Sequence, residues 1–169
     1  ARVDLVPVVG ECVQLLDERA REAGVELRWR PPADGRAMNV AGHEGEIHQV
    51  FTNLIVNAID AVGGERLTRP DRSAEMPPGR IEVTLEVAGA RSDRVRARVS
   101  DNGPGIAPER LETIFRPFYS SKLRSGGTGL GLAITHNIVH RHGGEIRAEN
   151  NPDRGCTFTV ELPRLDRVQ

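Results

Sequence analysis

Two asparagines lie four residues apart in a stretch with the periodicity of an amphipathic helix. Asn53 and Asn57 belong to a polar stripe that also contains Glu46, Gln49 and Asp60, at steps of three and four. At about 100° per residue, Asn57 lies beside the apolar stripe, where its amide needs a partner. Mg²⁺ in nucleotide sites keeps several waters and takes one or two protein oxygens, and an asparagine carbonyl can serve. The pair is therefore a candidate Mg²⁺ site, although in an isolated helix such asparagines are more often exposed or capping residues.

A carboxylate ends a second patterned stretch. Apolar residues alternate over 95–99, and the same parity places Asp101 on the apolar side of the expected strand. Gly103 and Gly105 follow, and their lack of side chains lets a flat ring approach the backbone. A carboxylate at an apolar slot suits an exocyclic amine such as N6 of adenine, because an unpaired buried carboxylate is costly. Taken alone, this segment is more often an ordinary turn.

A glycine-rich stretch over 126–132 leads into an amphipathic helix expected at 129–142. Backbone amides at a helix start bind phosphate, and glycines permit the close approach. The stretch is neither a Walker A loop, since GxxxxGK[ST] is absent, nor a dinucleotide fingerprint in its strand-turn-helix context.

Aromatic and basic residues precede the glycines. Phe115 and Phe118 are three apart and can dock a loop, while Lys122 and Arg124 can reach phosphate oxygens. A movable lid is one interpretation, and a solvated loop whose aromatics fill the core is the other, which we favour for Phe115.

Periodicity predicts the elements that must position these groups. We expect helices at 5–22, 44–62, 108–114 and 129–142, and strands at 25–30, 81–87, 95–99, 145–148 and 157–162. Asp4 is the expected N-cap of the first helix. The strands at 81–87 and 95–99 are expected to pair antiparallel. Residues 63–79, with three prolines, are expected to form an exposed connection. Strands covered by three longer helices imply a two-layer α/β (α+β) sandwich.

Composition excludes several classes. With 169 residues, 38% apolar and 28% charged residues and a net charge of −1, the chain fits one globular soluble domain and no nucleic-acid binder. It has neither a membrane-spanning run nor a signal peptide, so we expect a cytoplasmic location. Cys12 and Cys156 are expected to be reduced thiols. Because the sequence starts at Ala1 beside an amphipathic segment, we expect a piece of a longer protein.

In their order and spacing, these motifs resemble the ATP-binding catalytic domain of sensor histidine kinases over about residues 4–162. The N box is similar to 46–60, the G1 box to 101–105, the F box to 115–118 and the G2 box to 127–131. The resemblance implies a Bergerat-type (GHKL) fold, with a mixed, mostly antiparallel sheet covered on one face by three longer helices. It further implies one domain over 1–169, with residues 1–3 as a linker and an ATP lid at 115–127.

The same resemblance implies a cofactor, Mg-ATP, and roles for individual residues. Asn57 would be the principal Mg²⁺ ligand, with Asn53 near the phosphates and a second candidate ligand. Asp101 would read adenine, and Lys122 would contact the γ-phosphate. Asn53 and Lys122 would act by positioning, since the chain holds no nucleophile. The other implied nucleotide-binding residues are Asp60, Gly103, Gly105, Ile106, Phe118, Thr128, Gly129, Leu130, Gly131 and Leu132.

The resemblance also indicates the reaction. ATPases of the same fold carry a glutamate where this chain has Asn53, which cannot act as a general base, so phosphoryl transfer is favoured over hydrolysis. Residues 57–61 and 117–122 look most similar to sensor kinases of the nitrogen-regulation type. Alternatives are a hydrolysing or serine-phosphorylating member of the fold and a non-catalytic binding module.

The phosphoacceptor histidine of the family has no counterpart in this chain. The five histidines are His43, His48, His136, His140 and His142. Of these, His136 and His140 are expected at the surface, and a metal site at this pair is disfavoured because a third ligand is missing. The expected partners are therefore a separate dimerisation and histidine phosphotransfer domain and, indirectly, a response regulator. The full-length protein would be a homodimer, and this portion would lie in the cytoplasm without membrane contact, including when it belongs to an inner-membrane sensor.

Overall fold

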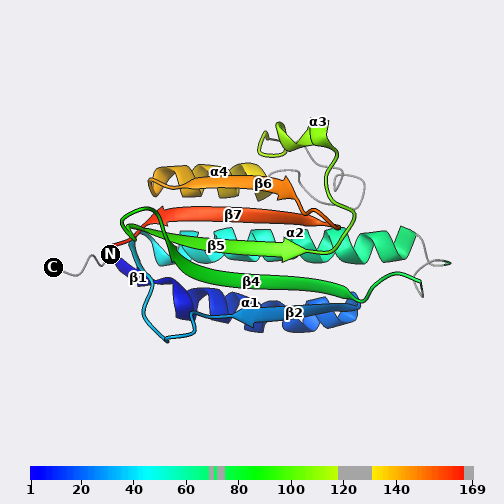
Figure 1. The fold of residues 1–169 in the computed structure, drawn as a ribbon, viewed down its shortest axis with the longest axis horizontal. Coiled ribbons are helices and arrows are strands. Elements are labelled where there is room, and N and C mark those ends of the chain that lie inside the picture. Colours follow the sequence, from blue (N-terminus) through cyan, green and yellow to red (C-terminus); the bar gives the residue numbers. More distant parts are fainter. Residues whose placement is uncertain (69–70, 72–74, 118–130, 166–169) are drawn as a thin grey trace.

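A five-stranded sheet and three long helices form two layers. The computed structural model describes residues 1–68, 71, 75–117 and 131–165. Helices α1, α2 and α4 lie on one face of the sheet, whose strands run in the order β2-β4-β5-β7-β6 (Figure 1). The elements are β1 (Arg2–Asp4), α1 (Leu5–Glu22), β2 (Val25–Arg30), β3 (Asn39–Ala41), α2 (Glu44–Thr68), β4 (Gly79–Ala88), β5 (Arg94–Asp101), α3 (Pro108–Leu111), α4 (Gly131–Arg141), β6 (Glu145–Asn150) and β7 (Cys156–Pro163). The predicted α/β sandwich is confirmed.

Strand pairing makes the sheet mixed, as predicted. β2 is parallel to β4, whereas β4–β5, β5–β7 and β7–β6 are antiparallel. Val99 of β5 lies opposite Val83 of β4 and Phe158 of β7, so alternate residues of the central strands form one apolar surface beneath the helices. The same alternation buries Asp101 at the end of β5.

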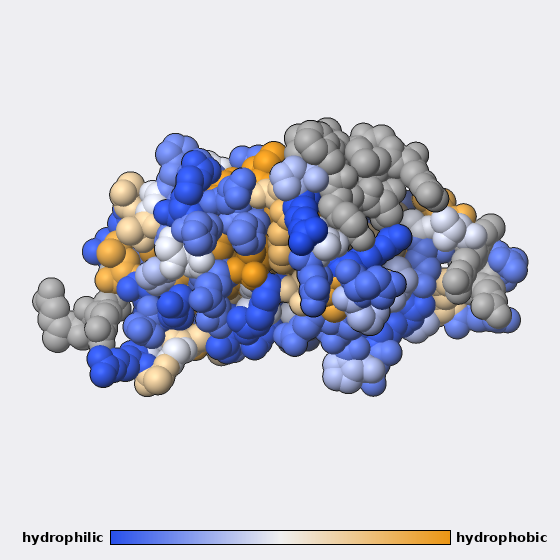
Figure 2. Space-filling view, turned by 90° about the horizontal axis from the view of Figure 1, so that it is seen from above, coloured by the Kyte–Doolittle hydropathy of each residue, from blue (hydrophilic) through white to orange (hydrophobic). Residues whose placement is uncertain are grey.

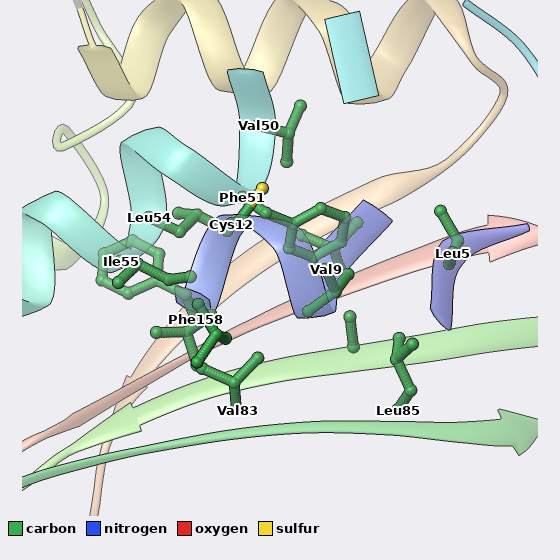
Figure 3. Close-up of a cluster of buried hydrophobic side chains, with 14 of the residues drawn as sticks. Leu5, Val9, Cys12, Val50, Phe51, Leu54, Ile55, Val83, Leu85 and Phe158 are labelled. Carbon is green, nitrogen blue, oxygen red and sulfur yellow. The ribbon is translucent and has the colours of Figure 1, made fainter. Parts of the chain in front are cut away.

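The core lies between that surface and the helices (Figure 3). Its side chains come from one stripe of each long helix and from alternate positions of the strands, which is the expected result of helical and strand periodicity. Labelled members are Leu5, Val9, Cys12, Val50, Phe51, Leu54, Ile55, Val83, Leu85 and Phe158. Burial of such side chains stabilises the fold by about 1.5–3 kcal/mol each.

The N-terminus is more ordered than the sequence indicated. Residues 2–4, partly within the expected linker over 1–3, form β1, which pairs antiparallel with β3 and places Val3, which is buried, opposite Val40. The strands have three residues each, too few for alternation to reveal them. Asp4 caps α1 as predicted: its Oδ1 accepts a hydrogen bond from the Val6 N–H at 3.1 Å.

Helix α2 continues beyond its predicted end. Residues 63–68 are helical, so the prediction of an exposed connection over 63–79 is wrong for its first part. Gly63 is buried against the end of α1, where an added Cβ would lie 3.1 Å from Cβ of Ala23. Close packing of the two helices therefore uses a glycine that the sequence placed in an exposed connection.

The face of the molecule on the side of α4 and β6 is mostly polar (Figure 2). Figure 2 shows the molecule from the side of α4 and β6, where hydrophobic residues interrupt a hydrophilic surface only in small groups. No helix among the described residues is long and apolar enough to cross a membrane.

Candidate functional site

Asp101 is a buried carboxylate at the end of β5, with 6% of its surface exposed. Its Oδ1 accepts hydrogen bonds from the N–H groups of Gly103 at 2.9 Å and Cys156 at 3.3 Å. Burial raises the pKa of Asp101, and these two hydrogen bonds oppose the rise. Within the described part of the chain, Oδ2 accepts no hydrogen bond. The site thus presents one carboxylate oxygen to a donor such as an exocyclic amine.

The loop after Asp101 has little room for side chains. A Cβ on Gly103 would lie 3.1 Å from Oδ1 of Asp101 and 3.3 Å from Cγ2 of Val62, and Gly105 has a φ of +80°. Asn150 of β6 fixes the next residue: its Oδ1 accepts from the Ile106 N–H at 2.8 Å, and its Nδ2 donates to the Ile106 carbonyl at 2.6 Å. Glycines therefore let the loop pack closely against its neighbours, and Asn150 of a neighbouring strand anchors it.

Asn53 and the start of α4 lie in contact. Nδ2 of Asn53 donates to Oγ1 of Thr135 at 3.2 Å and to the Gly131 carbonyl at 3.4 Å. Thr135 is fully buried, and its hydroxyl donates to the Gly131 carbonyl at 2.8 Å. Because the amide nitrogen is committed to α4, Oδ1 of Asn53 is the atom left for a ligand. Leu132, next to Gly131, is half-buried and packs against the core.

Asn57 and Asp60 lie one and two turns further along α2. Asn57 is half-buried, on the same polar stripe as Asn53. The carboxylate of Asp60 forms an ion pair with Arg19 of α1, with 3.4 Å between the charged atoms. The role of Asp60 in nucleotide binding stays a prediction.

An ion pair between distant segments supports the loop, and sequence reasoning missed it. Arg154, in the β6–β7 turn, forms two hydrogen bonds with Glu65 of α2, at 3.1 and 2.8 Å. Its Nη1 also donates to the carbonyl of Gly103 at 2.8 Å. The sequence signal for this contact was weak: Glu65 lies three residues after Val62, which would continue the helical repeat. The glycines at 63 and 64 instead favoured a loop at this point.

Several predicted site residues lie outside the described residues, and their roles stay predictions: Phe118, Lys122, Thr128, Gly129 and Leu130. Of the predicted lid, only 115–117 is described. Phe115 packs edge-on against Phe158 at 6.2 Å between ring centroids, which confirms the core-filling interpretation for this residue.

The histidines divide into two groups. His136 and His140 are exposed and stack with ring centroids 6.2 Å apart, as predicted for surface residues. His43 is also exposed, whereas His48 and His142 are half-buried. His43 caps α2 by accepting a hydrogen bond from the backbone N–H of residue 46, and His142 Nε2 accepts from the backbone N–H of His43. Among the described side chains, no group of three or more His, Cys, Asp or Glu is placed to hold a metal ion.

Comparison with known proteins identifies the class. Residues 42–166 match the family described as "Histidine kinase-, DNA gyrase B-, and HSP90-like ATPase". The chain belongs to this family of ATP-binding domains, in agreement with its fold and with the buried Asp101.

Individual relatives give the more particular assignment. The chain is 32% identical over 167 residues to the sensor histidine kinase ZraS of Salmonella typhi and 35% identical over 161 residues to ZraS of Escherichia coli K12, covering 99% and 95% of this chain. It spans about a third of each relative, 32% and 30% respectively. The solved catalytic domain of the histidine kinase ThkA superimposes with a TM-score of 0.77 at 32% identity, covering 97% of both chains. The chain is a sensor histidine kinase catalytic domain.

Proposed function

We propose that this domain binds Mg-ATP and positions the γ-phosphate for transfer to a histidine of a separate phosphoacceptor domain in two-component signalling. The observation that carries the proposal is Asp101, a buried carboxylate with Oδ1 fixed by two backbone amides and Oδ2 left for a donor. Adenine offers that donor at N6, whereas guanine has a carbonyl oxygen at the corresponding position. Gly103 lets the loop pack closely against Val62 and Asp101, which brings its N–H within hydrogen-bond distance of Oδ1.

The asparagines of α2 fit the phosphate end. Asn53 and Asn57 lie on one stripe of the helix and offer amide oxygens, which are ligands that Mg²⁺ accepts. Bound Mg²⁺ would supply neutralisation of phosphate charge, with Asn57 as its principal protein ligand. Asn53 would orient the phosphates through Oδ1, because its nitrogen is bonded to α4.

Transfer is favoured over hydrolysis by the chemistry of Asn53. A neutral amide cannot take a proton from water, and its nitrogen is already occupied as a donor to Thr135. The work left to this domain is positioning and charge stabilisation. Steady ATP hydrolysis by the isolated domain would instead support the hydrolytic alternative.

Further proposals concern the whole protein. We infer that it works as a homodimer, with a phosphoacceptor domain of its own and a cognate response regulator, and that this domain lies in the cytoplasm. One solved ThkA structure is a complex with the response regulator TrrA, which supports such a partner by analogy. We also propose, from the similarity of residues 57–61 and 117–122, that the protein belongs to the nitrogen-regulation subgroup of sensor kinases. The relatives named above are ZraS proteins and do not assign that subgroup.

The test is calorimetric titration with ADP and a non-hydrolysable ATP analogue, with and without Mg²⁺, and with GTP as control. We expect adenine-selective binding that Mg²⁺ strengthens. A purified phosphoacceptor domain of a relative then serves as substrate in trans, with labelled ATP. A folded domain that binds none of these nucleotides would refute the proposal and favour a non-catalytic module.

A further inference from the structure

Glu65 and Arg154 form an ion pair, called the clamp below, beside the loop of residues 102–106 that follows Asp101. They are 89 residues apart and are joined by two parallel hydrogen bonds, at 3.1 and 2.8 Å. The side chains are 11% and 33% exposed, respectively. A two-point contact of this kind fixes the plane of the guanidinium group as well as its position.

Both the N–H and the carbonyl group of Gly103 form hydrogen bonds. Its N–H donates to Oδ1 of Asp101 at 2.9 Å, and its carbonyl accepts from Nη1 of Arg154 at 2.8 Å. Nη1 also lies 3.4 Å from the carbonyl of Asn102. A continuous path of hydrogen bonds therefore runs from Glu65 through Arg154 and Gly103 to the buried carboxylate.

We propose that Arg154, oriented by Glu65, is a positioning residue that fixes Asp101 through Gly103 and so sets the affinity and selectivity for adenine nucleotides. This inference rests on the proposed function, in which Asp101 reads adenine. Arg154 does not itself need to touch the nucleotide. Its effect arises because it bonds the carbonyls of Asn102 and Gly103 and so holds the peptide units on both sides of Gly103. Rotation of the Asn102–Gly103 unit would remove one of the two donors that hold Oδ1, and with it the direction of Oδ2.

A second ion pair provides a matched control. Arg96 and Glu161 on the sheet are 26% and 12% exposed and 2.7 Å apart, so their burial resembles that of the clamp. This pair joins β5 to β7 without a hydrogen bond to the loop among the described contacts. Loss of Arg154 leaves Glu65 partly buried without its partner. Loss of Arg96 removes hydrogen bonds to both Glu161 and Glu86, so each change is expected to lower stability. Only loss of the clamp is expected to change nucleotide binding.

The charges around Asp101 supply a further readout. Arg154 lowers and Glu65 raises the pKa of Asp101, whose pKa is raised chiefly by burial. The neighbouring thiol of Cys156 has a pKa raised to about 12 and stays neutral. Removal of the Arg154 charge alone should raise the pKa of Asp101 further. As the pH is lowered, the variant should therefore lose adenine affinity at a higher pH than the wild type does.

The experiment compares Arg154→Gln, Arg154→Lys, Glu65→Gln and the control Arg96→Gln by calorimetry with ADP and GTP, together with thermal unfolding and a pH profile of ADP binding. We expect Arg154→Gln to weaken ADP binding by about tenfold or more, with little change for GTP, and to shift the acid limb of the profile upward. Arg154→Lys retains the charge and should recover part of the affinity. Arg96→Gln should lower the melting temperature with ADP affinity within about twofold of the wild type.

The outcomes are distinguishable. If wild-type protein binds adenine nucleotides, and Arg154→Gln and Arg96→Gln both lower stability but keep the wild-type ADP affinity, the clamp is only structural and the inference fails. If folded wild-type protein does not select adenine, the proposed function itself fails. Should Arg154→Gln not fold, Glu65→Gln and Arg154→Lys decide by the same ADP-to-GTP comparison.

Discussion

Replacement of Asp101 by asparagine separates the stability of the site from its recognition of adenine. The amide oxygen of Asn can accept the same hydrogen bonds from Gly103 and Cys156 that Oδ1 now receives at 2.9 and 3.3 Å. The amide nitrogen then occupies the place of Oδ2 and presents a donor where N6 of adenine also presents one. The change therefore preserves the loop and reverses the polarity of one atom.

The magnitude follows from the bond that is lost. A hydrogen bond to a charged group contributes about 1.5–3 kcal/mol, so ADP affinity should fall by about 10- to 150-fold. Binding of GTP should fall less or improve, because the new donor can face the guanine carbonyl. Equal losses for ADP and GTP would refute the assignment of Asp101 to adenine.

The nucleotide-free protein should respond in the opposite direction. Since burial raises the pKa of Asp101 above its ordinary value, the carboxylate lowers the free energy of unfolding once the pH is above that raised pKa. Asp101→Asn should therefore unfold at an equal or higher temperature than the wild type at neutral pH. This advantage should shrink as pH falls through the raised pKa toward about 4, the ordinary value for aspartate. Thermal unfolding at several pH values measures it, and a variant less stable at neutral pH would contradict the burial argument.

Four further substitutions test other parts of the site and fold. Asn57→Ala should abolish the Mg²⁺-dependent gain in ATP affinity in calorimetry while changing stability by less than about 1 kcal/mol, with exposed Gln14→Ala as control; an unchanged Mg²⁺ effect would refute the metal-ligand role. Thr135→Val should cost about 1–3 kcal/mol in chemical denaturation and weaken ATP more than Thr135→Ser does, because only serine keeps the partner of Asn53. Gly155→Ala should prevent folding or cost more than about 3 kcal/mol, since its Cβ would lie 1.9 Å from the Asp101 carbonyl at a φ of +89°; near-wild-type melting would count against this geometry. Gly64→Ala should instead stabilise by about 0.5–1 kcal/mol, because residue 64 is helical with nothing within 4 Å of the added Cβ, and a loss would argue against the long α2.

Local periodicity was enough to predict most elements. The spacing of apolar residues predicted α1, α4 and the strands β2, β4, β5, β6 and β7 to within a few residues, because each must turn one face toward a core. The same reasoning placed Asp101 on the inner side of β5, where the structure buries it. Residue type and order then sufficed to predict the ATP-binding family.

Elements without such periodicity were not predictable. β1 and β3 have three residues each, and only their pairing with one another explains them. The end of α2 was misjudged because the composition of residues 63–79 favoured an exposed connection, whereas Gly63 is buried against Ala23, the C-cap of α1. In each case the deciding contact comes from a segment distant in sequence.

The sequence by itself determined which side chains face the core and which residue types can meet adenine, phosphate and Mg²⁺, because these follow from local geometry and chemistry. Only the tertiary structure decided how those side chains are oriented. Thr135 directs the amide of Asn53 across 82 residues, and Arg154 reaches Glu65 across 89. The physical reason is that side-chain direction depends on hydrogen-bond partners, and these partners come together only when α2, α4 and the β6–β7 turn pack around the site.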